Sequence, residues 1–214
     1  MEELKYTLIT DGSSDIALMN IIKWLLDDLY PKLSNNGKYA DFSNLRTPPK
    51  KNEVLKRINH AKEYYPFDIL IYHRDAEATN IDIIEQRILE IKDHVPENSD
   101  DSIVCVIPMK MMETWLLISS DALKKAAGNR NYKENINLPN INRLESNQDP
   151  KTLLHTKLKE CSGLKTRRLD KFNTHQAVHL VAEYIEDYSP LRELYSFSKF
   201  ENDLKLEVDK ILEH

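Results

Sequence analysis

The 214-residue chain contains only two cysteines. Cys105 falls in a strand-like run and Cys161 in a helix-like one, far apart and with no Cys-x-x-Cys or Cys/His spacing nearby. This pattern is typical of reduced core thiols in an intracellular protein and argues against a structural zinc site. A chain of this length can bury a proper core without disulfides or a structural metal.

Long hydrophobic runs are also missing. No apolar stretch approaches the roughly 20 residues that a helix needs to cross a bilayer, and the N-terminal residues Met-Glu-Glu-Leu-Lys lack the pattern of a secretory signal. We therefore expect a cytoplasmic protein with no membrane partner. The chain also lacks a Gly-x-x-x-x-Gly-Lys phosphate loop and a Gly-x-Ser-x-Gly elbow, which argues against an ATPase and a serine hydrolase.

Short runs rich in β-branched residues alternate with helix-like stretches in the first half of the chain. Buried parallel strands are predicted at residues 6–10, 68–72 and 103–107, with a weaker strand near 39–45. Helices are predicted between them, and Ser13 and Ser14 are candidate N-caps of the first. The alternation is typical of an α/β fold, in which a mostly parallel sheet is flanked by helices on both faces.

The alternation of strand-like and helix-like stretches stops after Gly128. We expect an α/β domain at 1–128 and, at 129–214, an Asn-rich loop followed by a helical C-terminal extension packed on that domain. The last helix is predicted to open at a capping box over residues 198–201. Apolar residues are frequent in 189–197 and in this helix. They form either the surface on which a partner docks or a tail packed on the chain's own sheet.

Acidic side chains follow three of the predicted strands. Asp11 and Asp15 come after the first, Asp75 and Glu77 after the second, and Glu113 after the third. Because the carboxyl ends of parallel strands meet along one edge of an α/β sheet, we expect these carboxylates to lie close together. Like charges at short range either share protons or bind a divalent cation. The pattern therefore predicts a metal site at this edge.

Three segments resemble a known family. Residues 8–15, Leu-Ile-Thr-Asp-Gly-Ser-Ser-Asp, resemble the first TOPRIM motif, in which a strand ends in an acid followed by glycine and then by a second acid. Residues 68–77, Asp-Ile-Leu-Ile-Tyr-His-Arg-Asp-Ala-Glu, occupy the place of the TOPRIM Asp-x-Asp motif. With residues 107–117, Ile-Pro-Met-Lys-Met-Met-Glu-Thr-Trp-Leu-Leu, they look like a TOPRIM-like bacterial family related to the overcoming-lysogenization-defect nucleases.

The resemblance covers roughly residues 5–128 and implies a TOPRIM-like Rossmannoid fold. It also implies a nuclease that uses Mg²⁺ (or Mn²⁺) to hydrolyse phosphodiesters of DNA or RNA. Relatives of this type are often found beside ABC-type ATPases in defence against phage, so the implied partner is an ATPase that releases or activates the nuclease. The implied metal ligands are the five acids that follow the strands: Asp11, Asp15, Asp75, Glu77 and Glu113.

Two details depart from the TOPRIM pattern. Asp11 replaces the usual glutamate, and it could be either a ligand or a general base. At the second motif, either His73 and Asp75 or Asp75 and Glu77 fill the two acidic positions. The first choice supplies an imidazole and favours manganese or zinc. The second, which we prefer, is all-carboxylate and suits magnesium.

Basic residues have two interpretations. Arg74 and Lys110 lie next to strand-exit acids, where they either stabilise a transferring phosphoryl group or neutralise neighbouring carboxylates. The runs at 46–57 and 165–171 either track a nucleic-acid backbone or form solvated faces. The net charge of −5 argues against indiscriminate coating of nucleic acid.

Structural explanations compete with the functional ones. Asp15 and Glu113 could be acids at helix N-termini, and His73 a hydrogen-bonded histidine at the end of a strand. A metal-dependent nuclease is the function we favour. A non-catalytic TOPRIM-like binding or regulatory module, or a small-molecule phosphatase or phosphotransferase, stays open as an alternative. The oligomeric state is open too, a homodimer included.

Overall fold

The computed structural model describes residues 3–96, 99 and 101–213 of the chain. Its centre is a sheet of parallel strands in the order β2-β1-β3-β4. This α/β, Rossmann-like arrangement confirms the predicted fold class. The strands are β1 (Glu3–Ile9), β2 (Ser34–Tyr39), β3 (Ile69–His73) and β4 (Ser102–Val106).

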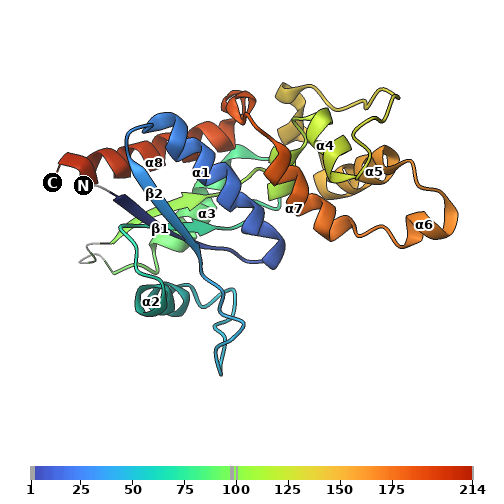
Figure 1. Cartoon of the computed structure of the whole chain (residues 1–214). Coiled ribbons are helices and arrows are strands. Elements are labelled where there is room, and N and C mark those ends of the chain that lie inside the picture. Colours follow the sequence, from blue (N-terminus) through green and yellow to red (C-terminus); the bar gives the residue numbers. More distant parts are fainter. Residues whose placement is uncertain (1–2, 97–98, 100, 214) are drawn as a thin grey trace.

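Helices cover both faces of the sheet (Figure 1). Strand residues alternate between two cores: Ile69 and Ile71 of β3 pack with α1 (Leu18–Leu29) and α8 (Tyr195–Glu213), whereas Leu70 and Tyr72 pack with α2 (Val54–Tyr64) and α3 (Ile81–Lys92). This period of two explains why the strand is apolar throughout, since each of its faces is buried. The continuous apolar run in the sequence therefore predicts that helices cover both faces of this strand.

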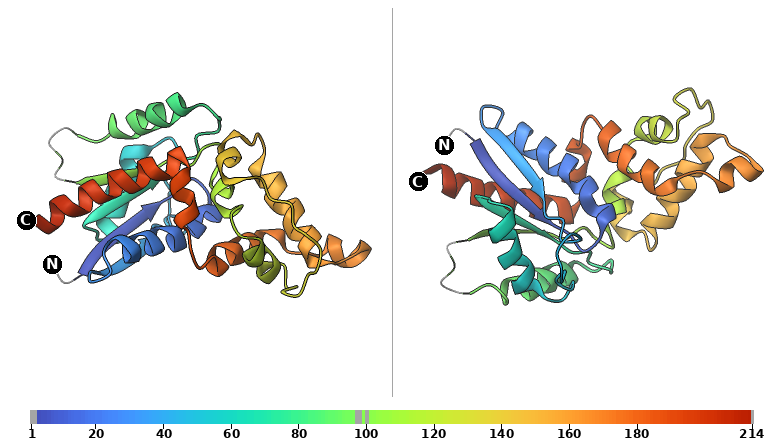
Figure 2. Two further views of the ribbon diagram at one scale, coloured as in Figure 1. Left: turned by 90° about the horizontal axis from the view of Figure 1, so that it is seen from above. Right: turned by 60° about the horizontal axis from the view of Figure 1, so that its bottom comes forward.

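A group of helices gathers beyond the carboxyl ends of the strands (Figure 2). It consists of α4 (Ser120–Ala126), α5 (Pro150–Ser162), α6 (Thr166–Asp170) and α7 (Thr174–Tyr184). Helix α5 begins after the capping side chain of Asp149 and ends at Gly163 with φ of +64°, as its sequence signals predict. This group of helices stands beside the carboxyl ends of the strands, where the predicted site residues lie.

The C-terminal segment packs on the chain itself. Phe197, Phe200 and Leu204 of α8 are buried against the sheet, and Leu191 and Leu194, just before that helix, are buried too. One of the two interpretations, that a partner docks on the apolar residues of 189–197 and the last helix, therefore does not hold for these side chains. The alternative, a tail packed on its own sheet, is the arrangement found.

Two element boundaries differ from the prediction. Strand β2 lies at Ser34–Tyr39 and not near 39–45, because its polar sequence serves an edge strand with little apolar signal. Helix α8 starts at Tyr195 and not at the capping box of 198–201. The carboxylate of Glu145 accepts the backbone N–H groups of Tyr195 and Ser196 at 3.0 and 2.9 Å. A cap that comes from 50 residues away leaves no local signal in the sequence.

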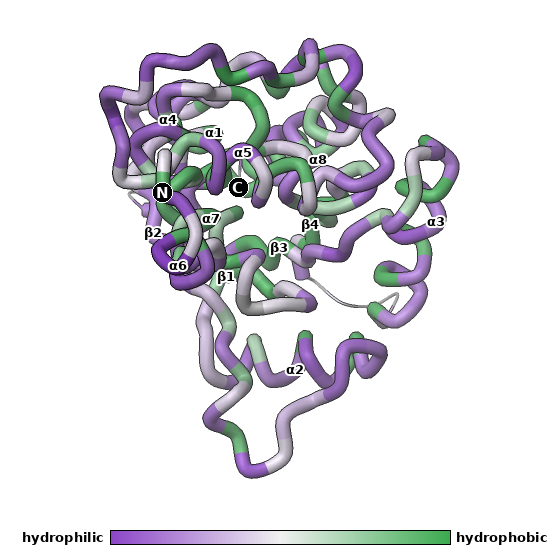
Figure 3. The backbone as a smooth tube through the Cα atoms, turned by 90° about the vertical axis from the view of Figure 1, so that its right-hand side faces the viewer, coloured by the Kyte–Doolittle hydropathy of each residue, from purple (hydrophilic) through white to green (hydrophobic). Residues whose placement is uncertain are grey.

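The first helix also begins differently. Ser13 and Ser14 are the predicted N-caps of this helix. Instead they lie within a 3₁₀ helix at Ser13–Ala17, which begins after Gly12 and leads directly into α1. Apolar residues gather on β1, β3 and β4 and on the inner sides of the helices, whereas β2 and α6 are mostly hydrophilic (Figure 3). Among the described residues, no helix is both long and apolar enough to span a membrane.

Candidate functional site

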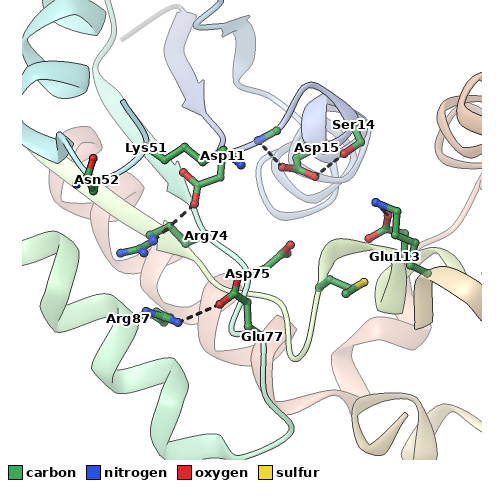
Figure 4. Close-up of a pocket in the computed structure, with 13 residues that line it drawn as sticks. Asp11, Ser14, Asp15, Lys51, Asn52, Arg74, Asp75, Glu77, Arg87 and Glu113 are labelled. Atoms are coloured by element: carbon green, nitrogen blue, oxygen red, sulfur yellow. Dashed lines mark hydrogen bonds and ion pairs between the residues drawn. The ribbon is translucent and has the colours of Figure 1, made fainter. Parts of the chain in front are cut away.

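A cavity of about 360 Å³ opens where the carboxyl ends of β1 and β3 meet the helical group (Figure 4). It contains all five acidic residues that the sequence singles out. It also contains four basic side chains, so the wall alternates in charge. The lining residues are Asp11, Gly12, Ser14, Asp15, Lys51, Asn52, Arg74, Asp75, Glu77, Arg87, Met111, Glu113 and Lys151.

Asp15 is a buried carboxylate held by the loop after β1. Its Oδ2 atom accepts the N–H of Gly12 at 2.9 Å, and its Oδ1 atom accepts the hydroxyl of Ser14 at 3.1 Å. The hydroxyl of Thr10 donates to the carbonyl of Gly12 at 2.7 Å and fixes the turn. The structural role foreseen for Asp15 at a helix start is thus real, but the same contacts also orient its carboxylate at the cavity wall.

His73 ends β3 and its side chain is fully buried beneath the acidic residues. Its Nδ1 lies 3.1 Å from the carbonyl oxygen of Val106, on β4. Its Nε2 points toward two carboxylates, at 3.6 Å from Oδ2 of Asp15 and 3.5 Å from Oδ1 of Asp75. Neither distance is a hydrogen bond, and Nε2 has no hydrogen-bond partner.

Asp75 follows β3 and sits among like charges. Burial, together with the nearby carboxylates of Asp15 and Glu113, raises the pKa of Asp75 to about 6. The His73 ring and the N–H of Met112, which donates to Oδ1 at 3.0 Å, oppose this rise. The raised pKa means that the ionised form of Asp75 is destabilised in the folded protein, and a bound cation would stabilise that form.

Glu113 completes the acidic cluster from a 3₁₀ helix at Met112–Leu116. Its residue is only 4% exposed, and its Oε1 lies 3.7 Å from Nζ of Lys151 on α5. Within the part of the chain that the structure describes, no three His, Cys, Asp or Glu side chains already have the geometry of an assembled metal site. Ligation by this cluster therefore requires rotation of one or more carboxylates.

Asp11 forms ion pairs with two arginines. Its Oδ1 accepts a hydrogen bond from Nη1 of Arg57 at 2.8 Å, and its Oδ2 lies 3.6 Å from Nε of Arg74. Arg57 is buried, with its guanidinium also bonded to Tyr72 and to the carbonyl of Thr10. Arg57 therefore cannot contact a nucleic-acid backbone, as the basic run at 46–57 suggested, and instead it neutralises Asp11.

Glu77 and Lys110 stand apart from the acidic cluster. The side chain of Glu77 is 76% exposed and pairs with Arg87 at 3.4 Å. Lys110 lies outside the cavity lining, and its Nζ donates to the carbonyl of Glu77 at 3.3 Å. Both residues have φ near +60°, in the left-handed region, because the two loops bond to each other through their backbones. Lys110 thus supports the loop that carries Asp75 and Glu77.

Sequence reasoning missed two of the three other basic side chains of the cavity. Lys51 comes from the loop before α2, Arg87 from α3 and Lys151 from α5. Lys51 lies in a basic run that the sequence does show. Arg87 and Lys151 lie on helices with no motif around them, so only the tertiary fold brings them to the acids.

Comparison with known proteins adds no assignment. No protein-family model, no curated protein sequence and no solved structure matches this chain.

Proposed function

We propose that the chain is a metal-dependent nuclease that hydrolyses phosphodiester bonds of DNA or RNA in this cavity. One observation carries the proposal: the carboxylates of Asp15 and Asp75 lie 3.6 and 3.5 Å from the unpartnered, buried Nε2 of His73. The buried Glu113 lines the same cavity, at the carboxyl ends of the parallel strands. This edge is where α/β folds place their active sites. The fit of the TOPRIM-like motifs to the same strand ends supports the proposal.

The charge of the cavity agrees with a cation-dependent reaction on a phosphate. Five acidic and four basic side chains line it, so without a bound cation the wall has a small net negative charge and repels a phosphodiester. One divalent cation reverses that sign. Two of the acids, Asp15 and Glu113, are buried. Three of the basic side chains, Lys51, Arg87 and Lys151, reach the cavity from separate parts of the chain.

Each group has a role in the proposed reaction. Asp15, Asp75 and Glu113 would hold the cation. When bound, the cation supplies Lewis-acid activation of the phosphate and lowers the pKa of an attacking water. Arg74, held between Asp11 and Glu90, orients a phosphate oxygen. Asp11 keeps Arg74 and Arg57 in place, and its ion pairs leave it unsuited to be a general base.

The test is cleavage of plasmid DNA and of tRNA by the purified chain in Mg²⁺, in Mn²⁺ and in EDTA. We expect cleavage with a divalent cation and none in EDTA. Asp15→Asn should reduce cleavage at least a hundredfold, whereas the matched change Asp121→Asn, at an exposed acid on α4, should leave it unchanged. Undiminished cleavage by folded Asp15→Asn protein would contradict the proposal.

The resemblance adds a partner to this proposal, an ABC-type ATPase that controls the nuclease in phage defence. A nuclease with a permanently active site would injure its host, so we expect low cleavage by the isolated chain and a rise when a genomically adjacent ATPase is added. Equal cleavage with and without that ATPase, at matched protein concentrations, would remove the partner from the proposal. The nuclease assignment itself would be unaffected.

One observation favours a second candidate, a phosphatase or phosphotransferase for a small phosphate ester. The cavity volume of about 360 Å³ lies at the low end of the range for small-molecule sites. Bis(p-nitrophenyl) phosphate and p-nitrophenyl phosphate separate the two functions. Faster turnover of the diester supports the nuclease, and turnover of the monoester alone supports the phosphatase.

A further inference from the structure

The orientation of the His73 ring is fixed by the backbone. The carbonyl oxygen of Val106 can only accept, so the Nδ1 atom 3.1 Å away carries a proton and donates it. The other nitrogen, Nε2, is thereby aimed at the carboxylates of Asp15 and Asp75. A histidine whose Nδ1–H binds a backbone carbonyl while Nε2 faces acidic groups has the second-shell arrangement of a metal ligand.

Hydrogen bonding does not account for Nε2. It is completely buried, lacks a partner, and stays 3.5 and 3.6 Å from the two nearest carboxylate oxygens. Those two oxygens already accept backbone N–H groups, from Met112 at 3.0 Å and from Gly12 at 2.9 Å. A buried polar atom left unpaired destabilises the fold, and binding of a metal ion would give this nitrogen a partner.

The distances from Nε2 to the two carboxylate oxygens fit a shared ion. Ligand atoms bonded to one transition-metal ion at about 2.1 Å, with angles between 90° and 110°, lie about 3.0–3.4 Å from each other. The distances from Nε2 to the two carboxylate oxygens, 3.5 and 3.6 Å, exceed this range by only a few tenths of an ångström. A small side-chain movement therefore brings each oxygen to the distance from Nε2 that two ligands of one ion have.

We propose that Nε2 of His73 is a direct ligand, with Asp15 and Asp75, of a first-row transition-metal ion, and that the site selects Mn²⁺ over Mg²⁺. Imidazole nitrogen binds manganese and its heavier neighbours but adds little for magnesium, which prefers oxygen. This inference rests on the proposed metal-dependent function and specifies its cofactor. Of the two possible assignments of the second motif, this inference favours His73 and Asp75 as the ligands. Glu77 is then not a ligand and stays in its ion pair with Arg87.

Pulsed electron paramagnetic resonance of bound Mn²⁺ tests the proposal directly, because a coordinated imidazole nitrogen modulates the electron-spin echo. We expect nitrogen modulation in the wild-type protein and its loss in His73→Gln. Calorimetry should show Mn²⁺ binding at least tenfold more tightly than Mg²⁺, with this ratio reduced about tenfold or more in His73→Gln. The matched control is His155→Gln on α5, a histidine near Glu113, which should keep the modulation.

The outcomes are distinct. Mn²⁺ bound without nitrogen modulation, or modulation that persists in folded His73→Gln, overturns the role of His73 and leaves the proposed nuclease standing. Failure of both ions to bind the wild-type protein overturns both proposals. If His73→Gln does not fold, ¹⁵N-histidine spectra of the wild type with and without Zn²⁺ decide the matter. The Nε2 resonance of His73 must shift when the metal binds, and an unshifted resonance overturns the inference.

Discussion

Asp75 is the residue where fold stability and the proposed chemistry conflict. Its pKa, raised from an ordinary value of 3.8 to about 6, means that the folded protein without metal holds this proton more tightly than the unfolded chain does. The stability contributed by that proton is present below pH 4 and is lost as pH rises to about 6. His73, Asp15 and Glu113 are the charged or titratable groups that face it.

We therefore expect Asp75→Asn to stabilise the metal-free protein at pH 7, by on the order of 1–2 kcal/mol once partial solvent exposure is allowed for. The same change should abolish cleavage. Thermal melting between pH 4 and 7, compared with Asp121→Asn, measures the first effect. A melting temperature for Asp75→Asn that falls below that of the wild type at every pH would contradict the electrostatic explanation.

The two cysteines give a second prediction about single residues. Cys105 is 3% exposed and Cys161 is fully buried, and burial raises the pKa of their thiols to about 12 and about 11. Since only the thiolate reacts, neither should be modified by a thiol reagent such as Ellman's reagent at pH 8 in the native protein. Both should react at once in guanidinium chloride. Rapid labelling of the native protein would show that one thiol is accessible.

At the scale of elements, the pairing of β1 with β2 depends on a single glycine. Gly37 lies opposite Tyr6 in the register, and a Cβ atom added there would stand 2.2 Å from the Tyr6 ring. Tyr6 is itself buried, so its ring has little room to move. We expect Gly37→Ala to destabilise the fold by about 1–3 kcal/mol, the usual cost of overpacking.

Asn36→Ala is the matched control for this prediction, because the neighbouring side chain on β2 is exposed. Chemical denaturation of the two variants measures the difference. Combining Gly37→Ala with Tyr6→Leu should recover part of the lost stability, since the smaller side chain leaves space for the new methyl group. Equal stability of Gly37→Ala and Asn36→Ala would show that the ring moves without cost.

The whole molecule brings together groups from separate layers around one cavity. Because a ligand that binds only the folded state stabilises it, Mn²⁺ at a hundredfold excess over its dissociation constant should add about 2.7 kcal/mol. For a chain of this size that corresponds to a rise in melting temperature of about 5–10 °C. EDTA should reverse it, and Asp15→Asn should show little rise. A wild-type melting curve that ignores Mn²⁺ would argue against the metal centre.

The sequence by itself determined the layers of the sheet and the edge at which the acids meet. Apolar runs such as Ile69–His73 can be recognised in the sequence because both faces of a central parallel strand are buried. Since the carboxyl ends of parallel strands lie side by side, the acids that follow them, Asp15, Asp75 and Glu113, are predicted to lie together. Helix α5 was legible for a similar reason, since its cap signals are local.

Only the tertiary structure decided which groups face which. The sequence could not show that Arg57 neutralises Asp11, that Glu77 turns toward Arg87, or that Glu145 caps α8. Each of these contacts joins residues at least 10 positions apart, and the direction of a side chain depends on the packing around it and not on its neighbours in the chain. The sequence could not show either that Nε2 of His73 lacks a hydrogen-bond partner, because the residues around it come from β1, β3, β4 and the loops that follow them.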